Sequence, residues 1–196
     1  MNTFIKNNNL LILENTLSQI PQSYFILNEN EWVKAAHYNA TLSNYSFYAT
    51  QSNTSPNTVT ANSVGDGSAG QSGNFANFAN VASWGGVAGI FTTVGTNGIS
   101  SSYGIYDGCG NINEWTEGIS DTSRVRRGGS YNNVISGNAP NIGSRYFLNP
   151  TSRNVDTGLR IGSYIYPNSN FVQVGDINNP NHSTGFGSVS YSFFCF

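Results

Sequence analysis

The sequence predicts an α+β domain with few helices, small antiparallel sheets and long ordered loops. Only one stretch, Glu29–His37, has a helical pattern, whereas several short stretches alternate between apolar and polar residues as strands do. The chain between them is rich in Asn, Ser, Thr and Gly, the residue types that form turns. With 12 Phe, 11 Tyr and 3 Trp the chain still has enough aromatic surface to build a core.

Length and charge limit the classes of protein to which the chain can belong. Its 196 residues suit one large domain. Only 9% of the residues are charged and the net charge is −2, so no basic surface for nucleic acid or an anionic membrane is expected. No window approaches the roughly 20 apolar residues of a membrane span. The apolar patch at residues 10–13 is shorter than a signal-peptide core, so we expect a soluble chain without its own export signal and leave its compartment open.

Two elements are expected near the start of the chain. Residues 1–23 are Asn-rich and weakly patterned, and residues 23–27 read as a short strand. Asn28 can then cap a helix whose first turn is acidic. Trp32, Ala35 and Ala36 share one face of that helix, which makes it amphipathic.

Residues 38–102 have little periodicity and abundant Asn, Ser, Thr and Gly. Such a stretch is too long for a simple connection, so we expect an excursion that side chains or ions keep ordered. Further strands are expected at residues 124–131, 158–164, 171–174 and 188–196.

Four motifs follow one another in a characteristic order. They are E-W-x-x-A-A at residues 31–36, Y-G-I-Y-D-G-C-G-N-I-N-E-W at 103–115, R-G-G-S-Y at 127–131 and G-L-R at 158–160. Together, over roughly residues 24–163, they resemble the formylglycine-generating enzyme, or sulfatase-modifying factor, family. The resemblance implies a C-type-lectin-like fold, in which small sheets and few helices hold long loops.

The order of segments looks circularly permuted relative to that family. Residues 24–165 resemble the family's core, and residues 166–196 resemble the strands that open such domains. In this fold the first and last strands are antiparallel neighbours, so a hairpin can join them and permutation is tolerated. A fragment across the seam of two tandem copies, or a truncated gene, is the alternative.

The resemblance also exposes a chemical difference. The family's oxidase chemistry needs two cysteine thiolates for copper(I), a soft ion that prefers sulfur. Asn133 and Asn138 occupy these two positions, so no copper and no formylglycine-forming activity are expected. Cys109 and Cys195 lie in other motifs and are expected to be free thiols. The only histidines offer no better site: His37 is expected to be a surface cap at the helix end and His182 to lie in a polar turn.

One calcium ion is implied by the resemblance. The matching positions are Asp107 and Glu114, which would bind through carboxylates, and Gly110 and Ile112, which would bind through carbonyls. Oxygen ligands of this kind suit a hard cation, although the two acids would equally well cap the turn. At the family's second calcium site only one half is matched, by Asn77 and Phe78, because the expected aspartate falls near Gly86.

The remaining conspicuous side chains have structural interpretations. Arg127, Arg145 and Arg160 are expected to tie loops together through carboxylates or carbonyls. Trp32 and Trp115 are expected to belong to the core.

The preferred functional hypothesis is a calcium-stabilised, non-catalytic module that binds an unidentified protein or small molecule. The loop at residues 132–157 would carry the site, an adaptable set of amides with one aromatic ring: Asn132, Asn133, Asn138, Asn141, Tyr146 and Asn154. One alternative is an oxidase relative with a rearranged site. Another is a partial domain of a larger assembly that self-associates through the apolar strand at residues 188–196.

Overall fold

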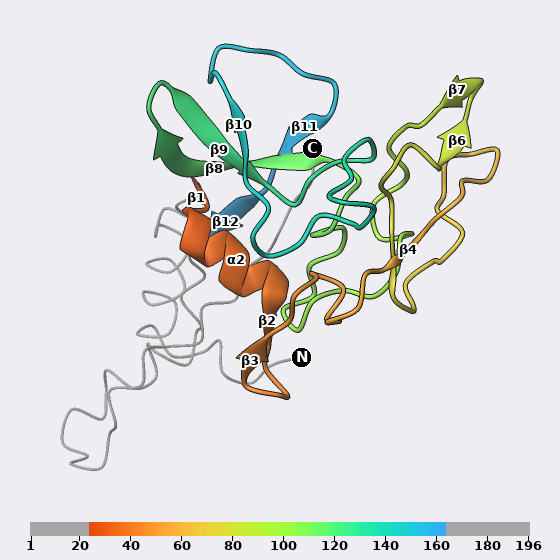
Figure 1. Cartoon of the computed structure of the whole chain (residues 1–196), viewed down its shortest axis with the longest axis horizontal. Helices are drawn as coiled ribbons and strands as arrows, with labels where there is room; N and C mark the ends of the chain where they lie inside the picture. Colours follow the sequence, from red (N-terminus) through yellow and green to blue (C-terminus); the bar gives the residue numbers. More distant parts are fainter. Residues whose placement is uncertain (1–23, 164–196) are drawn as a thin grey trace, which may run out of the picture. The chain divides into compact units, whose positions relative to one another are not determined.

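The computed structural model of the chain describes residues 24–163, and residues 26–162 of this range form one unit. Within the described range the backbone forms one α-helix and many short strands connected by long loops (Figure 1). This composition confirms the predicted α+β class. The expectations for residues 1–23 and 166–196, including His182, Cys195 and the two late strands, lie outside the described residues.

Helix α2 (Glu29–His37) begins at the predicted cap. The side-chain oxygen of Asn28 accepts the Glu31 N–H at 2.9 Å, and the Glu31 carboxylate accepts the Asn28 N–H at 2.9 Å. These reciprocal bonds satisfy two N–H groups that the helix itself leaves without partners. The buried face carries Trp32, Ala35 and Ala36, as the pattern predicted. Two small residues on this face let the motif turn approach closely, so a methyl group at Gly108 would lie 3.2 Å from Cβ of Ala36.

A four-stranded sheet packs beside α2 in the order β10-β9-β8-β11 (Figure 1). Strands β8 (Asn113–Ser120) and β9 (Ser123–Arg127) form an antiparallel hairpin, and β10 (Tyr146–Leu148) extends it. Strand β11 (Thr157–Leu159) joins the other edge parallel to β8, so the prediction of antiparallel sheets was wrong for this pair. The sheet thereby brings the end of the 132–157 loop next to the 103–115 motif, because Thr157 lies opposite Asn113.

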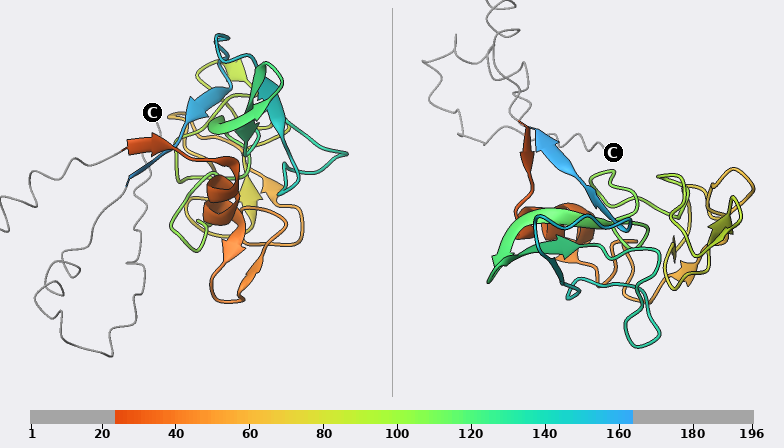
Figure 2. Two further views of the ribbon diagram at one scale, coloured as in Figure 1. Left: turned by 90° about the vertical axis from the view of Figure 1, so that its left-hand side faces the viewer. Right: turned by 90° about the horizontal axis from the view of Figure 1, so that it is seen from above.

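The other strands form two-stranded pairs that stiffen the loops (Figure 2). The pairs are β1 (Tyr24–Ile26) with β12 (Ile161–Ser163), β2 (Tyr38–Asn39) with β3 (Asn44–Tyr45), β4 (Asn57–Thr58) with β5 (Phe75–Ala76), and β6 (Ser83–Trp84) with β7 (Val87–Ala88). Strand β1 lies at the predicted place, and β9 covers the first half of the strand expected at residues 124–131.

Buried amide side chains hold the long excursion between α2 and β8. Asn111 pairs with the backbone of Thr92 in both directions, at 2.8 Å from the Thr92 N–H and 3.1 Å to the Thr92 carbonyl. Asn77 donates to the Ile90 carbonyl at 2.9 Å, and the Thr92 hydroxyl donates to Asn97 at 2.7 Å. These side-chain bonds tie distant parts of the excursion together, which is one of the two ways of ordering it, side chains or ions, expected from its length.

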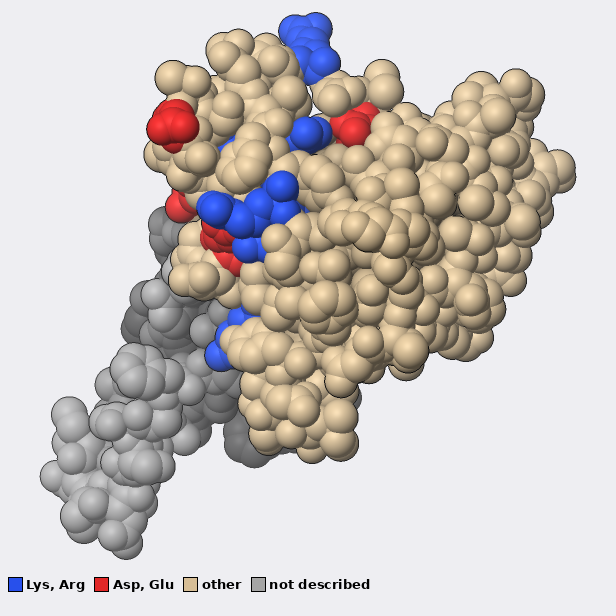
Figure 3. All heavy atoms as spheres, viewed as in Figure 1, with Lys and Arg blue, Asp and Glu red and all other residues tan. Residues whose placement is uncertain are grey.

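The surface of the described chain is sparsely charged. Charged side chains gather on one side of the face in Figure 3, and the rest of that face is uncharged. Between residues 24 and 163 there is no helix with the length and apolar character needed to cross a membrane.

Candidate functional site

The 103–115 motif folds into a turn that leads directly into β8. Asp107, Gly110 and Asn111 all have positive φ angles, of 59°, 76° and 64°. Gly110 is required at its position because a Cβ there would lie 2.1 Å from the carbonyl O of Asn77, with which Gly110 forms a parallel bridge. The turn is thus held against the excursion at Gly110 and Asn111, whose N–H donates to the Asn77 carbonyl at 2.7 Å.

Asp107 accepts hydrogen bonds from the excursion. Its two carboxylate oxygens accept the Gly95 N–H and the Asn97 side-chain amide, each at 2.9 Å. Burial raises the pKa of Asp107, and these two donors and the nearby Arg160 charge partly oppose that rise. The carboxylate therefore closes the turn through hydrogen bonds.

Glu114 is almost completely buried, at 2% exposure, and its carboxylate has cationic and neutral donors. Arg160 makes a two-pronged ion pair with it, with Nε 2.8 Å from one oxygen and Nη2 on the other. The Trp32 indole N–H donates to the same carboxylate at 2.6 Å. The motif turn, the helix and Arg160, the residue that directly follows β11, are joined at this one side chain.

The residues of the predicted calcium site lie in and directly after this turn, and the oxygens of Asp107, Glu114 and Gly110 already have partners. Arg160 and Trp32 occupy the Glu114 carboxylate, and the Gly110 carbonyl accepts the Ile112 N–H at 2.9 Å. A calcium ion fits here only if it shares Glu114 with Arg160. In the described part of the chain, no three His, Cys, Asp or Glu side chains cluster as metal ligands. At the family's second calcium site, Asn77 has a buried side-chain oxygen without a hydrogen-bond partner among the described residues.

Asn133 occupies the first of the two positions at which the resemblance implies a copper-binding cysteine, and hydrogen bonds hold its side chain in place. The side-chain oxygen of Asn133 accepts the Ser130 N–H at 2.9 Å, the Ser130 hydroxyl at 3.0 Å and the Asn113 amide at 3.3 Å. Ser130 is fully buried, and its hydroxyl also lies 3.2 Å from the Asp156 carboxylate. Asp156 in turn pairs with Arg126 at 3.3 Å. This network is polar and buried, and its members act as partners to one another.

Asn138, at the second of these cysteine positions, lies in a tight exposed turn. Ile135 and Asn138 exchange backbone hydrogen bonds at 2.8 and 2.9 Å, and the two residues between them have positive φ angles. The Asn138 side-chain amide donates to the Ser136 carbonyl at 3.2 Å.

The loop at residues 132–157 separates the six predicted ligand residues into two groups. Asn132, Asn138 and Asn154 are exposed, and the Asn132 side-chain oxygen also accepts the hydroxyl of the buried Ser130 at 2.8 Å. Asn133, Asn141 and Tyr146 are partly buried and have structural contacts. Asn141 accepts the Gly143 N–H at 2.9 Å, and burial raises the pKa of the Tyr146 hydroxyl in β10 to about 12.

Comparison with known proteins identifies the family. Residues 9–163 match the sulfatase-modifying factor enzyme 1-like domain. The chain belongs to this family. A solved structure, Treponema denticola variable protein 1, is similar at 20% sequence identity with a TM-score of 0.44. The similarity covers 71% of this chain and 47% of that one, so the chain spans about half of that protein's length. No curated protein matches the chain.

The arginines of this sulfatase-modifying-factor-like domain have the predicted structural roles. Arg127 donates to the carbonyls of Ile142 and Ser144 at 2.8 and 2.9 Å and pairs with Glu29. Arg145 binds the same carboxylate through two bonds, at 2.6 and 2.8 Å. Burial tends to raise the pKa of Glu29, but the two guanidinium groups outweigh it and hold that pKa below its usual value. The sequence interpretation did not single out Arg126, whose role depends on Asp156, a residue far away in sequence.

The expectation for His37 was wrong. The imidazole is buried, at 2% exposure, with Nδ1 3.1 Å from the Ser46 carbonyl and its ring against Trp32. The chain turns back after α2, so the helix end is covered and not exposed. Trp32 is in the core as predicted, Trp115 is half-buried beneath Arg126, and the Cys109 thiol is free and buried.

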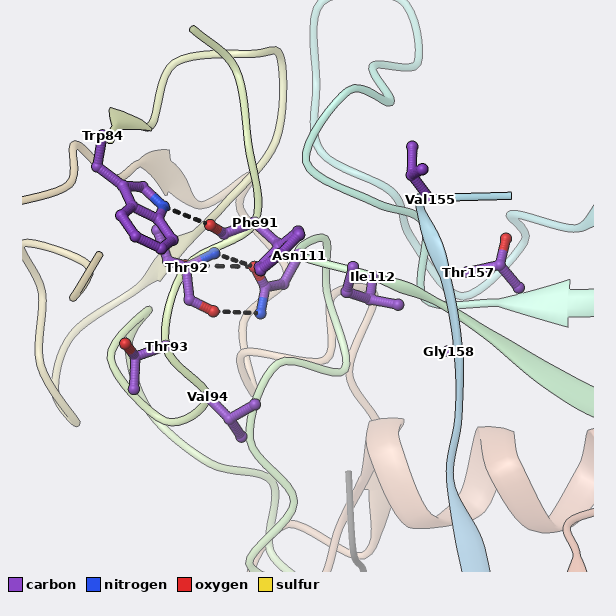
Figure 4. A pocket seen from close by; sticks show the side chains of 10 residues that line it. All are labelled: Trp84, Phe91, Thr92, Thr93, Val94, Asn111, Ile112, Val155, Thr157 and Gly158. Atoms are coloured by element: carbon purple, nitrogen blue, oxygen red, sulfur yellow. Dashed lines mark hydrogen bonds between the residues drawn. The ribbon is translucent and has the colours of Figure 1, made fainter. Parts of the chain in front are cut away.

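An open cavity of about 470 Å³ was not expected from the sequence. Trp84, Phe91, Thr92, Val94 and Ile112 line one side of it, and Val155, Thr157 and Gly158 line the opposite side (Figure 4). No short motif could have revealed it, because its two sides lie more than 40 residues apart in the sequence, from Ile112 to Val155.

Proposed function

We propose that this sulfatase-modifying-factor-like domain is a non-catalytic binding module. The observation that carries the proposal is the hydrogen bonding of Asn133. This residue occupies one of the two positions at which the resemblance implies a copper-binding cysteine, and its side-chain oxygen accepts hydrogen bonds from Ser130 and Asn113. A carboxamide cannot replace a thiolate on copper(I). Ser130, Asp156 and Arg126 continue the same network and hold the loop.

A copper(I) titration tests the non-catalytic part. The purified chain competes with a coloured chelator for copper(I), and a cysteine-containing peptide is assayed for conversion to an aldehyde. We expect neither a stoichiometric thiolate complex nor aldehyde. A stoichiometric thiolate complex with copper(I), or the formation of aldehyde, would support the oxidase alternative.

The ligand would contact the exposed members of the 132–157 loop, namely Asn132, Asn138 and Asn154. Arrays of immobilised peptides and glycans are screened with the chain, and each ligand found is tested against a variant with all three changed to alanine. We expect capture to be lost while the melting temperature stays within about 2 °C, because the three side chains are exposed and the Ser130 hydroxyl, which Asn132 accepts, retains Asn133 and Asp156 as acceptors. Unchanged capture contradicts this surface as the site.

Calcium at Asp107, Gly110, Ile112 and Glu114 is the second element of the proposal. The support is the match to the motif, and the ion would share Glu114 with Arg160. Thermal unfolding with calcium and with excess chelator tests it. Free ion at 100 times the dissociation constant would add about 2.7 kcal/mol to the free energy of unfolding. If the melting temperature is the same with calcium and with chelator, Arg160 is the sole cation on Glu114.

A C-type-lectin-like arrangement with permuted ends is the corresponding proposal for the fold. It is supported by the pairing of β1 with β12, which places the start and the end of the described core side by side. Chains joined at such a point tolerate permutation. An experimental structure that places residues 166–196 away from the core would refute the permutation.

A further inference from the structure

The cavity between the excursion and β11 is already formed in the chain as it stands. The Trp84 indole N–H donates to the Phe91 carbonyl at 2.8 Å, which fixes the two aromatic residues relative to each other. The Trp84 ring rests directly on Gly65, where a Cβ would lie 2.7 Å away. Behind them Thr92 is tied to Asn111 through both its N–H and its carbonyl. A rigid wall of this kind costs a ligand little reorganisation on binding.

Apart from the exposed Thr93 hydroxyl, the polar side chains that line the cavity have hydrogen-bond partners within the chain. The indole N–H of Trp84 and the amide of Asn111 have the partners just described. The Thr157 hydroxyl accepts from Arg126 at 2.5 Å and donates to Asp156 at 2.9 Å. Charged side chains are absent from the lining. An ionised group would lose its hydration here without gaining a partner, which makes its burial costly.

The apolar side chains at the mouth remain in contact with water. Phe91 is 41% exposed, Val94 50% and Val155 80%, and they come from two distant segments that face one hollow. Apolar groups that gather in this way mark binding sites more often than ordinary surface. The volume of about 470 Å³ lies within the range of roughly 300–1,000 Å³ that is typical of small-molecule sites.

We infer that this cavity binds an uncharged small molecule with a flat aromatic ring system. The ring would lie against Trp84 and Phe91, since aromatic pairs gain about 0.5–1.5 kcal/mol beyond the burial of their area. The inference rests on the proposed binding role and assigns it a ligand class. The site is separate from the exposed asparagines Asn132, Asn138 and Asn154.

Two probes that differ by one charge test the ligand class. N-phenyl-1-naphthylamine is neutral and fluoresces in apolar surroundings, and 1-anilinonaphthalene-8-sulfonate has the same ring skeleton with an anionic sulfonate. Each is titrated into the full-length chain. We expect the neutral probe to bind with a stoichiometry of one, at least tenfold tighter than the anionic one, with energy transfer from Trp84. Equal or tighter binding of the anionic probe overturns the inference.

Matched variants locate the site. Val94→Asp places a charge in the wall, and Ile119→Asp introduces the same group at a residue that is also exposed, at 65%, outside the cavity. We expect the first to weaken the neutral probe at least tenfold and the second to leave it unchanged. Phe91→Ala gives a second, uncharged disruption and should also weaken binding, and each variant's melting temperature is measured to establish that it folds.

Three outcomes separate this inference from the proposed function. Neutral-probe binding that survives both Val94→Asp and Phe91→Ala overturns the cavity assignment. No neutral-probe binding to the full-length chain also overturns it, and leaves a protein partner as the occupant to test. The alanine variant of Asn132, Asn138 and Asn154 is expected to bind the probe normally, so loss of array capture in that variant tests the proposed function alone.

Discussion

His37 ends α2 with its imidazole buried against Trp32 and hydrogen-bonded to the Ser46 carbonyl. Burial lowers its pKa from 6.5 to about 4, and the nearby Arg127 charge adds to that effect. Between these values the unfolded chain binds a proton that the folded chain does not. The free energy of unfolding therefore falls as the pH drops from 6.5 to 4, by about 2–3 kcal/mol in total.

Urea unfolding at intervals from pH 7 to pH 4 measures this dependence. In His37→Gln, which retains an N–H for Ser46 but does not titrate, we expect a flatter profile across the same interval. Parallel profiles for the two proteins would mean that His37 is not the group responsible.

The ion pair of Glu114 with Arg160 is the most buried charge pair among residues 24–163, with side-chain exposures of 3% and 4%. Removing one partner leaves an uncompensated charge, so Arg160→Met should cost about 3–5 kcal/mol. Glu114→Gln together with Arg160→Met removes both charges and should cost less than the sum of the single changes. Chemical denaturation of the four proteins gives the coupling, and strict additivity would argue against a direct pair.

At the level of elements, α2 was predictable because its cap, first turn and apolar face are local. Strand β8 was not predicted, because its buried positions carry Asn113, Glu114 and Thr116, so the usual apolar alternation is missing. Their polarity is tolerated because partners arrive from α2, from β9, from the 132–157 loop and from Arg160, which lies between β11 and β12. The cavity was unpredictable for the same reason, since it depends on which distant segments become neighbours.

Two glycines with similar backbone conformations differ in how closely distant segments approach them. Gly110 (φ 76°) would bring a Cβ to 2.1 Å from the Asn77 carbonyl, whereas Gly85 (φ 60°) faces open space. Both alanine variants pay for a left-handed backbone, about 1–2 kcal/mol. Only Gly110→Ala also forces the motif turn away from the excursion, so we expect it to lose several kcal/mol more, on the order of overpacking a core. Thermal unfolding of the two variants makes the comparison, and equal losses would contradict the close approach.

For the whole molecule, the open question is what keeps so much irregular backbone ordered with so few charges. Ions are one answer and buried polar side chains are the other. The first requires calcium for order in the excursion, whereas the second places the stabilising bonds in the amides of Asn111 and Asn133 and the carboxylate of Asp107. These side chains accept backbone N–H groups at 2.8–2.9 Å, and such bonds do not themselves require a metal.

Hydrogen exchange distinguishes the two mechanisms. The amides of Thr92, Gly95 and Ser130 lie in loops yet donate to those three side chains, so we expect them to exchange about as slowly as the amides of β8, with calcium or with chelator. The Leu42 amide is the matched control, because it also donates to an asparagine, Asn39, at 3.0 Å, but in an exposed hairpin where opening is cheap. It should exchange fast. If the Thr92 amide exchanged as fast as the Leu42 amide in chelator and slowed only with calcium, the ion would be what orders these loops. The hydrogen bonds to the three side chains would then form only after the ion has bound.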